Sequence, residues 1–207
     1  MSKLAILGAS GHGKVVADTA LQAGWEEIVF FDDAWPEFHK NGSYLVKGNT
    51  ESLLSSSEFD GVVVAIGNNQ LRLKQTQILL DAGFNLPTLV HPRAYVADDV
   101  VIDAGSVLFA GSVVQPGTRL GKAVIVNTGA TIDHDCTIAE GVHIAPGAHL
   151  AGGVSVSELT WIGIGASINQ YLNIGANVTI GAGAAVINEL ADGLTVIGVP
   201  ARALKKI

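Results

Sequence analysis

The feature that most limits how this chain can fold is a six-residue repeat that covers nearly half of its length. A strand alternates its faces every two residues and a helix every 3.6. A period of six therefore predicts short straight segments that each point one repeated residue inward and are separated by bends, as in a parallel β-helix. The repeated positions are all aliphatic: Val90, Val96, Ile102, Leu108, Val114, Leu120, Val126, Ile132, Ile138, Ile144, Leu150, Val156, Ile162, Ile168, Ile174, Ile180 and Val186.

A second set of residues keeps the same phase, two positions before each aliphatic, and its members are small or β-branched. Residues i and i−2 of a strand share a face, so both sets should line one interior. The composition suits such a narrow core, with 48% hydrophobic residues, only 6% aromatic residues and 25 glycines. The second set includes Ser106, Ser112, Thr118, Val124, Ala130, Cys136, Val142, Ala148, Val154, Thr160 and Ala166.

Cysteine content and charge restrict the class of protein. Cys136 is the single cysteine and falls in the inward set, so we interpret it as a core residue rather than a nucleophile. The net charge of −7 argues against a nucleic-acid partner. No apolar run reaches the roughly 18 residues of a spanning helix, and Met1 leads straight into a strand pattern without a signal peptide. We expect a cytoplasmic protein without membrane insertion.

The first 86 residues have a different pattern, in which buried strands alternate with helices. This alternation predicts parallel βαβ units in a small, doubly wound, Rossmann-like α/β domain that binds its ligand at the carboxyl ends of the strands. The expected domains are 1–86, this α/β domain; 87–190, an all-β β-helix; and 191–207, a C-terminal cap. Strands are expected over 3–8, 28–31, 61–66 and 86–90, and helices over 14–23 and 70–82.

A glycine loop lies between the first strand and the first helix and contains Gly11, His12 and Gly13. Glycines let the backbone approach a phosphate, and the helix N-terminus favours negative charge. Asp32 and Asp33 follow about 20 residues later, where a carboxylate can accept hydrogen bonds from a ribose. NAD fits the motif, but the domain is only half the size of a dinucleotide fold, so a nucleotide sugar fits better. A purely structural turn and solvent-exposed acids are the alternatives.

Gly67 and Asn68 follow the third strand and should complete the same pocket. His12, flanked by glycines, should project toward the ligand unless it is merely an exposed histidine. Arg72 either contacts phosphate or lies on a helix surface, and the sequence does not separate these two possibilities.

The phase of the repeat also places three histidines. His134, two residues after an inward aliphatic, should lie on a corner between Asp133 and Asp135, where a carboxylate would raise its basicity as a general base requires. His143 and His149 each precede an inward aliphatic and should point outward from adjacent flat faces. That splayed arrangement argues against a shared zinc site, so we expect no metal.

Over essentially its whole length the chain resembles the hexapeptide-repeat acyltransferases with an N-terminal nucleotide-sugar domain. This is the sialic acid O-acetyltransferase-like group, whose best-described members N-acetylate UDP-4-amino sugars in bacillosamine synthesis. Each matching motif is weak alone, but together they are specific. They are Leu7 to Gly13, Asp32-Asp33, Ala65 to Asn69, Asn127-Thr128, His134-Asp135, His143 and Gly198 to Ala201.

The resemblance implies a homotrimer of left-handed β-helices that transfers acetyl from acetyl-CoA to an amine of a nucleotide-linked sugar, of the UDP-4-amino-4,6-dideoxy-N-acetylglucosamine type. By resemblance His134 is the base and Asp135 the acid that raises its basicity. The family commonly has glutamate where this chain has Asp135, so it is open whether the shorter aspartate side chain makes the same contact with His134. His143, Ile164 and Ala182 correspond to acetyl-CoA contacts. The nucleotide-sugar contacts correspond to Gly11, His12, Gly13, Asp32, Asp33 and Gly67.

Three rival functions stay open on the sequence. The same base can serve a sugar O-acetyltransferase of the sialic acid type. An ice-binding or scaffolding β-helix would need regular outward threonine ladders, whereas the outward residues here are mixed, for example Arg119, Thr131 and Trp161. A carbonic-anhydrase-like metal site is the third rival.

Overall fold

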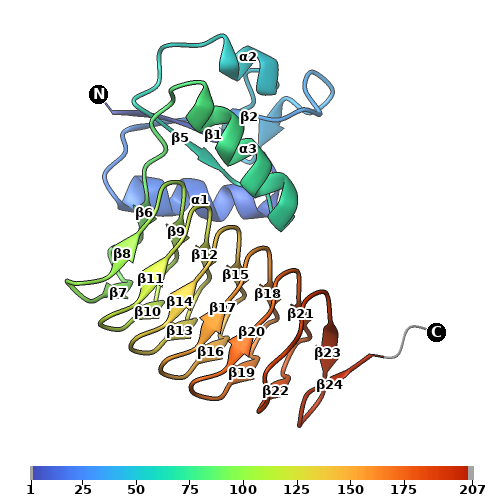
Figure 1. Ribbon diagram of the computed structural model, residues 1–207. Helices are drawn as coiled ribbons and strands as arrows, with labels where there is room; N and C mark the ends of the chain where they lie inside the picture. Colours follow the sequence, from blue (N-terminus) through green and yellow to red (C-terminus); the bar gives the residue numbers. More distant parts are fainter. Residues whose placement is uncertain (1, 205–207) are drawn as a thin grey trace.

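The six-residue repeat forms a left-handed parallel β-helix, on which a small α/β unit sits at the N-terminal end (Figure 1). The structure is a computed structural model and describes residues 2–204. From Leu89 to Val186, successive strands on the same face pair in parallel at a separation of 18 residues, as in the registers Val114↔Ile132 and Ile132↔Leu150. Three hexads therefore make one coil. The fold class predicted from the repeat is confirmed.

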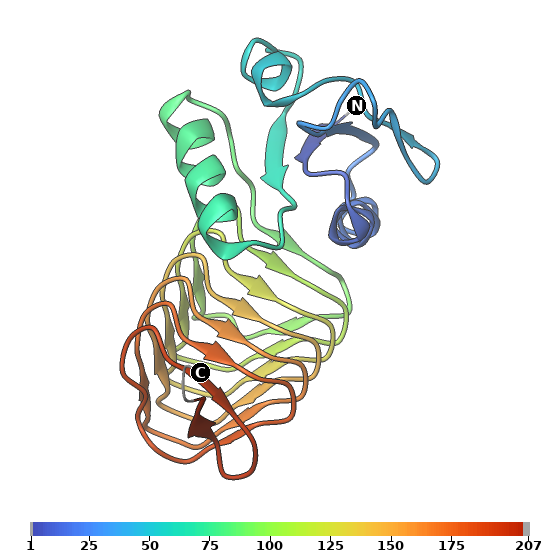
Figure 2. The ribbon, with the colours of Figure 1, turned by 90° about the vertical axis from the view of Figure 1, so that its right-hand side faces the viewer.

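The coils have three flat faces, which are seen nearly end-on in Figure 2. We call them faces C, D and E. Face C contains β6 (Leu89–Val90), β9 (Val107–Leu108), β12 (Ile125–Val126), β15 (His143–Ile144), β18 (Trp161–Ile162) and β21 (Thr179–Ile180), followed by β23 (Thr195–Ile197) and β24 (Arg202–Ala203). Face D contains β7 (Tyr95–Val96), β10 (Val113–Val114), β13 (Thr131–Ile132), β16 (His149–Leu150), β19 (Ser167–Ile168) and β22 (Ala185–Val186). Face E contains β8 (Val101–Ile102), β11 (Arg119–Leu120), β14 (Thr137–Ile138), β17 (Ser155–Val156) and β20 (Asn173–Ile174).

Both inward sets of the repeat pack into one core. From Leu108 to Val186 the aliphatic residues at the repeated inward positions are at most 2% exposed. Cys136, from the second inward set, lies among them and is 0% exposed. The hydroxyl groups in this core donate hydrogen bonds to backbone carbonyls at the corners of the coils. Ser106 donates to the carbonyl of Gly121, and Thr160 donates to that of Gly175, both at 2.8 Å. Polar residues at these positions therefore leave no unpaired hydroxyl in the core.

The N-terminal unit contains a three-stranded parallel sheet in the order β2-β1-β5. Helix α1 lies between this sheet and face C, whereas α3 covers the opposite side of the sheet (Figures 1 and 2). One apolar cluster runs from the sheet through α1 to the outward residues Val107 and Ile125 of face C. The elements are β1 (Lys3–Leu7), α1 (Gly11–Gln22), β2 (Glu27–Phe31), β3 (Lys40–Asn41), β4 (Tyr44–Leu45), α2 (Thr50–Leu54), β5 (Gly61–Val64) and α3 (Asn69–Asp81).

One expectation for this unit was wrong. The predicted strand 86–90 does not join the α/β sheet, because Leu89 and Val90 pair with β9 and begin the β-helix. Between residues 40 and 54, where the sequence predicts no strand or helix, the structure has the β3–β4 hairpin and helix α2, which Asn49 caps by accepting from the Ser52 amide at 3.0 Å. The sequence signal was weak because these elements are only two to five residues long.

The C-terminal segment turns back in an antiparallel pair of β23 and β24, where the sequence predicts a cap. Residues 205–207 of that predicted cap lie outside the described residues. The domain limits at 86/87 and 190/191 stay predictions. Among the described residues, no helix combines the length and the apolar character needed to cross a bilayer.

Candidate functional site

The glycine loop packs tightly against the ends of the neighbouring strands. Gly8 has φ +109°, and a Cβ on it would lie 2.7 Å from the carbonyl oxygen of Ala65. A Cβ on Gly13 would lie 2.4 Å from the carbonyl oxygen of Gly8. Both positions exclude any larger residue. This packing brings the N-terminus of α1 next to the carboxyl ends of β1, β2 and β5, with Gly11 exposed at its start.

A cavity of about 250 Å³ opens at these strand ends and is lined by both acids that the sequence singles out. Asp32 also ties the glycine loop down, because its carboxylate accepts from the amides of Ala9 at 2.7 Å and Ala34 at 3.0 Å. Asp33 accepts from the amide of Thr50 at 2.9 Å. The two acids are therefore held by backbone donors. The rest of the lining comes from Leu7, Gly8, Ser10, Ala65, Ile66, Gly67 and Leu71.

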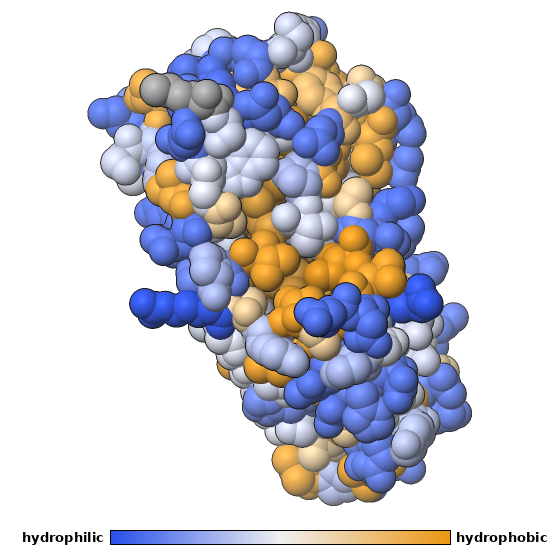
Figure 3. Space-filling view, turned by 90° about the vertical axis from the view of Figure 1, so that its left-hand side faces the viewer, coloured by the Kyte–Doolittle hydropathy of each residue, from blue (hydrophilic) through white to orange (hydrophobic). Residues whose placement is uncertain are grey.

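A second cavity, of about 360 Å³, lies between the glycine loop and face C. It brings together His12 of α1 and His143 of β15, whose ring centroids are 6.4 Å apart. The His12 ring meets Phe109 edge-on at 5.6 Å, and the His143 ring lies 4.0 Å from that of Trp161. Apolar side chains gather where the N-terminal unit meets the β-helix (Figure 3). Residues chosen separately from the sequence thus meet in one apolar cavity.

His143 projects outward from face C, as predicted, but is only 5% exposed because the N-terminal unit covers it. Burial, the charge of Arg72 and the nearby His12 lower the pKa of His143 to about 3. Burial and the charge of Arg72 lower the pKa of His12 to about 4. Both rings are therefore neutral near pH 7 and are poor candidates for a base that accepts a proton there.

The hydrogen bonds of Asn127 determine which nitrogen of His143 carries the proton. Its Oδ1 accepts from the Thr128 amide at 2.8 Å, which turns its Nδ2 toward His143 Nε2 at 3.1 Å. Nε2 is then an acceptor, and the ring proton lies on Nδ1. His143 Nδ1 is buried without a partner among the described residues, as is His12 Nε2. His143 thus offers a donor that no described residue uses.

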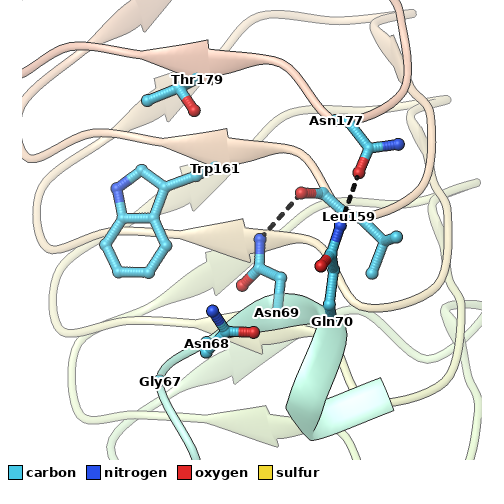
Figure 4. Close-up of a pocket in the computed structure, with 8 residues that line it drawn as sticks. All are labelled: Gly67, Asn68, Asn69, Gln70, Leu159, Trp161, Asn177 and Thr179. Carbon is cyan, nitrogen blue, oxygen red and sulfur yellow. Dashed lines mark hydrogen bonds between the residues drawn. The ribbon is translucent and has the colours of Figure 1, made fainter. Parts of the chain in front are cut away.

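A third cavity, of about 690 Å³, lies between the start of α3 and the β-helix, where Trp161 and Thr179 of face C line it (Figure 4). Asn69 donates from Nδ2 to the carbonyl of Leu159 at 3.0 Å, and Gln70 approaches Asn177 at 3.4 Å. The cavity is lined by uncharged residues and shares Gly67 and Trp161 with the second cavity. Gly67 lines all three cavities.

His134 and Asp135 form the hydrogen-bonded pair that a base requires. They lie on the corner between β13 and β14, where His134 Nδ1 is 2.8 Å from Asp135 Oδ2 and Asp135 has φ +59°. The hydrogen bond with Asp135 raises the pKa of His134 above its ordinary value, with smaller contributions from the charges of both neighbouring acids. The ring lies over Gly152 of the next coil, where a Cβ would be 2.5 Å from Nε2. Nε2 is left as the nitrogen that can accept a proton.

This pair lies apart from the cavities of its own chain. His134 is on the corner between faces D and E, whereas His143 is on face C, and His134 lines none of the three cavities. Two further predicted residues lie on the corner between faces C and D. Ile164 is 61% exposed and borders the His143 cavity, whereas Ala182 is exposed one coil farther on. In one chain the His134–Asp135 pair and the His143 cavity therefore lie on different sides of the β-helix.

The sequence also singles out His149 and Arg72. His149 is exposed on face D, where its Nδ1 is 2.9 Å from the hydroxyl of Thr131. Within residues 2–204, no three histidine, cysteine or acidic side chains are grouped to hold a metal ion. Arg72 fits neither role considered from the sequence, because it is 0% exposed and bonds to backbone carbonyls of both parts of the chain. Its helical position gives no signal of this contact.

Comparison with known proteins identifies relatives of both parts. Residues 3–79 match the family described as the PglD N-terminal domain. A curated UDP-N-acetylbacillosamine N-acetyltransferase from Bacillus subtilis (strain 168) is 36% identical over 122 residues. That match spans 53% of this chain and 52% of the relative, so the chain spans about half the length of this relative.

Two solved structures match nearly end to end. The acetyltransferase domain of PglB from Neisseria gonorrhoeae FA1090, in complex with acetyl coenzyme A, is 46% identical with a TM-score of 0.94, and the match covers 98% of each chain. A mutant of perosamine N-acetyltransferase from Caulobacter crescentus, in complex with CoA and GDP-perosamine, is 34% identical with a TM-score of 0.95. That match covers 100% of this chain and 98% of the other.

The two buried histidines predict a loss of stability in mild acid. Below pH 6.5 the unfolded chain binds protons on His12 and His143 that the folded chain does not bind. The free energy of unfolding therefore decreases as the pH is lowered. Between pH 6.5 and 5 we expect a loss of about 2 kcal/mol per histidine. Urea unfolding across this range should show a shallower pH slope in His143→Asn and an unchanged slope in the exposed control His149→Asn. Equal slopes in the wild type and both variants would contradict the assignment.

Proposed function

This chain belongs to the bacillosamine-type hexapeptide-repeat acyltransferases, and we propose that it transfers the acetyl group of acetyl-CoA to the amine of a nucleotide-linked amino sugar. The proposed acceptor is of the UDP-4-amino-4,6-dideoxy-N-acetylglucosamine type, in keeping with the curated relative's name. Acetyl-CoA as cosubstrate is supported by the relatives solved with acetyl coenzyme A or CoA.

The observation that carries the proposal is the His134–Asp135 pair. The acid bonds to Nδ1 at 2.8 Å, which keeps the ring proton there and leaves Nε2 to accept a proton from the acceptor amine. The two histidines that line the proposed substrate pocket, His12 and His143, instead have pKa values lowered to about 4 and about 3. Among these three, His134 is the one suited to act as a base near neutral pH.

The proposed reaction is direct transfer without an acyl-enzyme. The amine nitrogen attacks the thioester carbonyl carbon while His134 Nε2 takes the amine proton. The tetrahedral intermediate then expels the CoA thiolate, which is protonated to the thiol, and the acetamide is released. Cys136 is 0% exposed in the core, and burial raises its pKa, so it takes no part.

The three cavities and the glycine loop suggest how the substrates lie. We assign the nucleotide to the cavity of Asp32 and Asp33, and its phosphates to Gly11, His12 and Gly13 at the start of α1. Gly67 borders both this cavity and that of His143.

Acetyl-CoA is assigned to the corner that bears Ile164 and Ala182. Its thioester carbonyl would lie near His143, whose Nδ1–H donor suits a developing oxyanion. The face-C pocket then holds both reacting groups and needs a base from elsewhere.

We infer that this base comes from a second copy of the chain, in a homotrimer. His134 is on the corner between faces D and E of its own β-helix, and the pocket is on face C. Cyclic symmetry would bring the His134 corner of one protomer to the pocket of the next, so each site would contain residues of two chains.

A thiol-release assay with acetyl-CoA and UDP-, dTDP- and GDP-linked amino sugars tests the activity. With the preferred acceptor, His134→Ala should lose about 10²- to 10⁴-fold in kcat, as expected for loss of a general base. Cys136→Ala should keep nearly the wild-type rate. Equal rates in the two folded variants would exclude His134 as the base, and release with a free hydroxyl sugar but with no amine would favour O-acetylation.

The acid of the pair predicts a shift in the pH profile. Asp135 raises the pKa of His134, and the base acts only when unprotonated, so kcat/KM should rise with pH through that pKa. Asp135→Asn should move this acidic limb to lower pH and reduce the plateau rate, while Asp133→Asn should have a smaller effect. An acidic limb at the same pH in Asp135→Asn would contradict the pairing.

Mixed assembly tests whether the sites are shared. His134→Ala lacks the base and His143→Ala lacks the proposed donor, so each alone should be nearly inactive. After the two variants are unfolded and refolded together in equal amounts, about one quarter of the sites should combine both intact residues. Recovery to about a quarter of the wild-type rate is expected, and mixing without unfolding is the control. No recovery from a mixture shown by mass spectrometry to contain hybrid trimers would place base and pocket in one chain.

A further inference from the structure

Arg72 is the largest fully buried side chain among the described residues, and its guanidinium joins three separate backbone segments. Its Nη1 donates to the carbonyls of Ile66 and Gly67, both at 3.1 Å. Its Nε donates to the carbonyl of Ala123 at 2.9 Å, and its Nη2 donates to that of Gly141 at 2.8 Å. One side chain thus links the β5–α3 loop to two successive coils of the β-helix.

No carboxylate among the described residues pairs with this buried charge. The remaining close partner is the side-chain oxygen of Asn69, at 2.9 Å from Nη2. Asn69 in turn donates to the carbonyls of Leu159 and Thr160 on the following coil, at 3.0 and 3.2 Å. A buried cation without a counter-ion is costly, and this one is compensated only by carbonyl and amide dipoles. Such an arrangement requires the five donors of a guanidinium in their planar fork, which a lysine ammonium cannot reproduce.

The loop that Arg72 holds forms part of every cavity at the proposed site. Ile66 lines the nucleotide cavity, and Gly67 lines that cavity, the His143 cavity and the cavity beside Trp161. The carbonyls of both residues are bonded to Arg72. Ile66 packs against the apolar cluster of the sheet, whereas a Cβ on Gly67 would meet nothing within 4 Å, so side-chain packing does not hold the backbone at Gly67 itself. The position of Gly67 over face C is therefore held by the hydrogen bonds of the Arg72 guanidinium, next to the Asn69 amide that bonds to the following coil.

We propose that Arg72 is a positioning residue that sets the Gly67 loop, and with it the nucleotide-sugar pocket, at the correct place over face C for acetyl transfer. It acts through the loop and contacts neither substrate. The proposal rests on the function proposed above and adds a residue to it. It predicts that the planar fork of Arg72, rather than its positive charge, determines acceptor binding.

Two substitutions separate the fork from the charge. Arg72→Met removes both, whereas Arg72→Lys keeps a cation on a similar stem. With the preferred amino-sugar nucleotide, both should raise the acceptor KM by roughly tenfold or more, with the acetyl-CoA KM within about twofold of wild type; tenfold corresponds to about 1.4 kcal/mol. Lys122→Met is the matched control, because it removes a partly exposed cation beside Ala123 on the same corner, where Lys122 pairs with Glu140 at 3.2 Å. It should leave both KM values unchanged.

Three results would overturn the proposal. One is Arg72→Lys with wild-type KM values, which would assign the effect to charge. Another is a lower melting temperature with both KM values unchanged in Arg72→Met and Arg72→Lys, which would make the residue structural only. The third is an equal fall in the affinity for both substrates.

Hydrogen–deuterium exchange tests the proposal without using activity. In the Arg72 variants, amides of residues 65–69 should exchange faster while those of the coils from 150 to 186 stay protected. Exchange of 65–69 that stays at the wild-type rate would overturn the proposal even if a variant is too unstable for kinetics. If the wild-type protein acetylates no amino sugar, the proposed function fails, whereas exchange still decides whether Arg72 holds the loop.

Discussion

The parallel register of 18 residues between successive coils is the constraint on which the rest of this structure depends. In the inner coils an outward residue lies directly between the residues 18 positions before and after it, as His143 lies between Ile125 and Trp161. The backbone hydrogen bonds of the coils fix these columns, so the surroundings of a side chain follow from its place in the repeat. Inserting or deleting one residue within a strand would shift the later side chains out of these columns.

The N-terminal unit turns one such column into a site. Val107 and Ile125 are apolar and form part of the core beneath α1, so the unit sits over the first coils of face C. His143 is next in the same column and is buried by this docking. The contact that buries the apolar underside of the unit therefore also keeps the imidazoles of His12 and His143 neutral, because burial disfavours their charged forms.

The sequence predicted what depends on the phase of the repeat. Cys136 in the core and His134 on a corner follow from counting along the chain, because the coils repeat every 18 residues. The sequence did not predict what depends on the docking of the two parts. The burial of His143 and the contacts of Arg72 with carbonyls of the β-helix arise between segments more than 50 residues apart, and no local pattern reports such contacts. The strand at Leu89 was assigned to the wrong sheet for a related reason, since an apolar pair fits both the α/β sheet and the first coil.

The backbone at Asp135 links the stability of a corner to the strength of the proposed base. Its φ of +59° lies in the left-handed region, which aspartate and asparagine tolerate better than longer side chains. Its carboxylate nevertheless reaches His134 at 2.8 Å, so the short side chain does not lose the contact. A glutamate here would exchange an easier backbone conformation for a longer reach. One residue thus contributes both to the conformational strain of the corner and to the hydrogen bond that raises the pKa of His134.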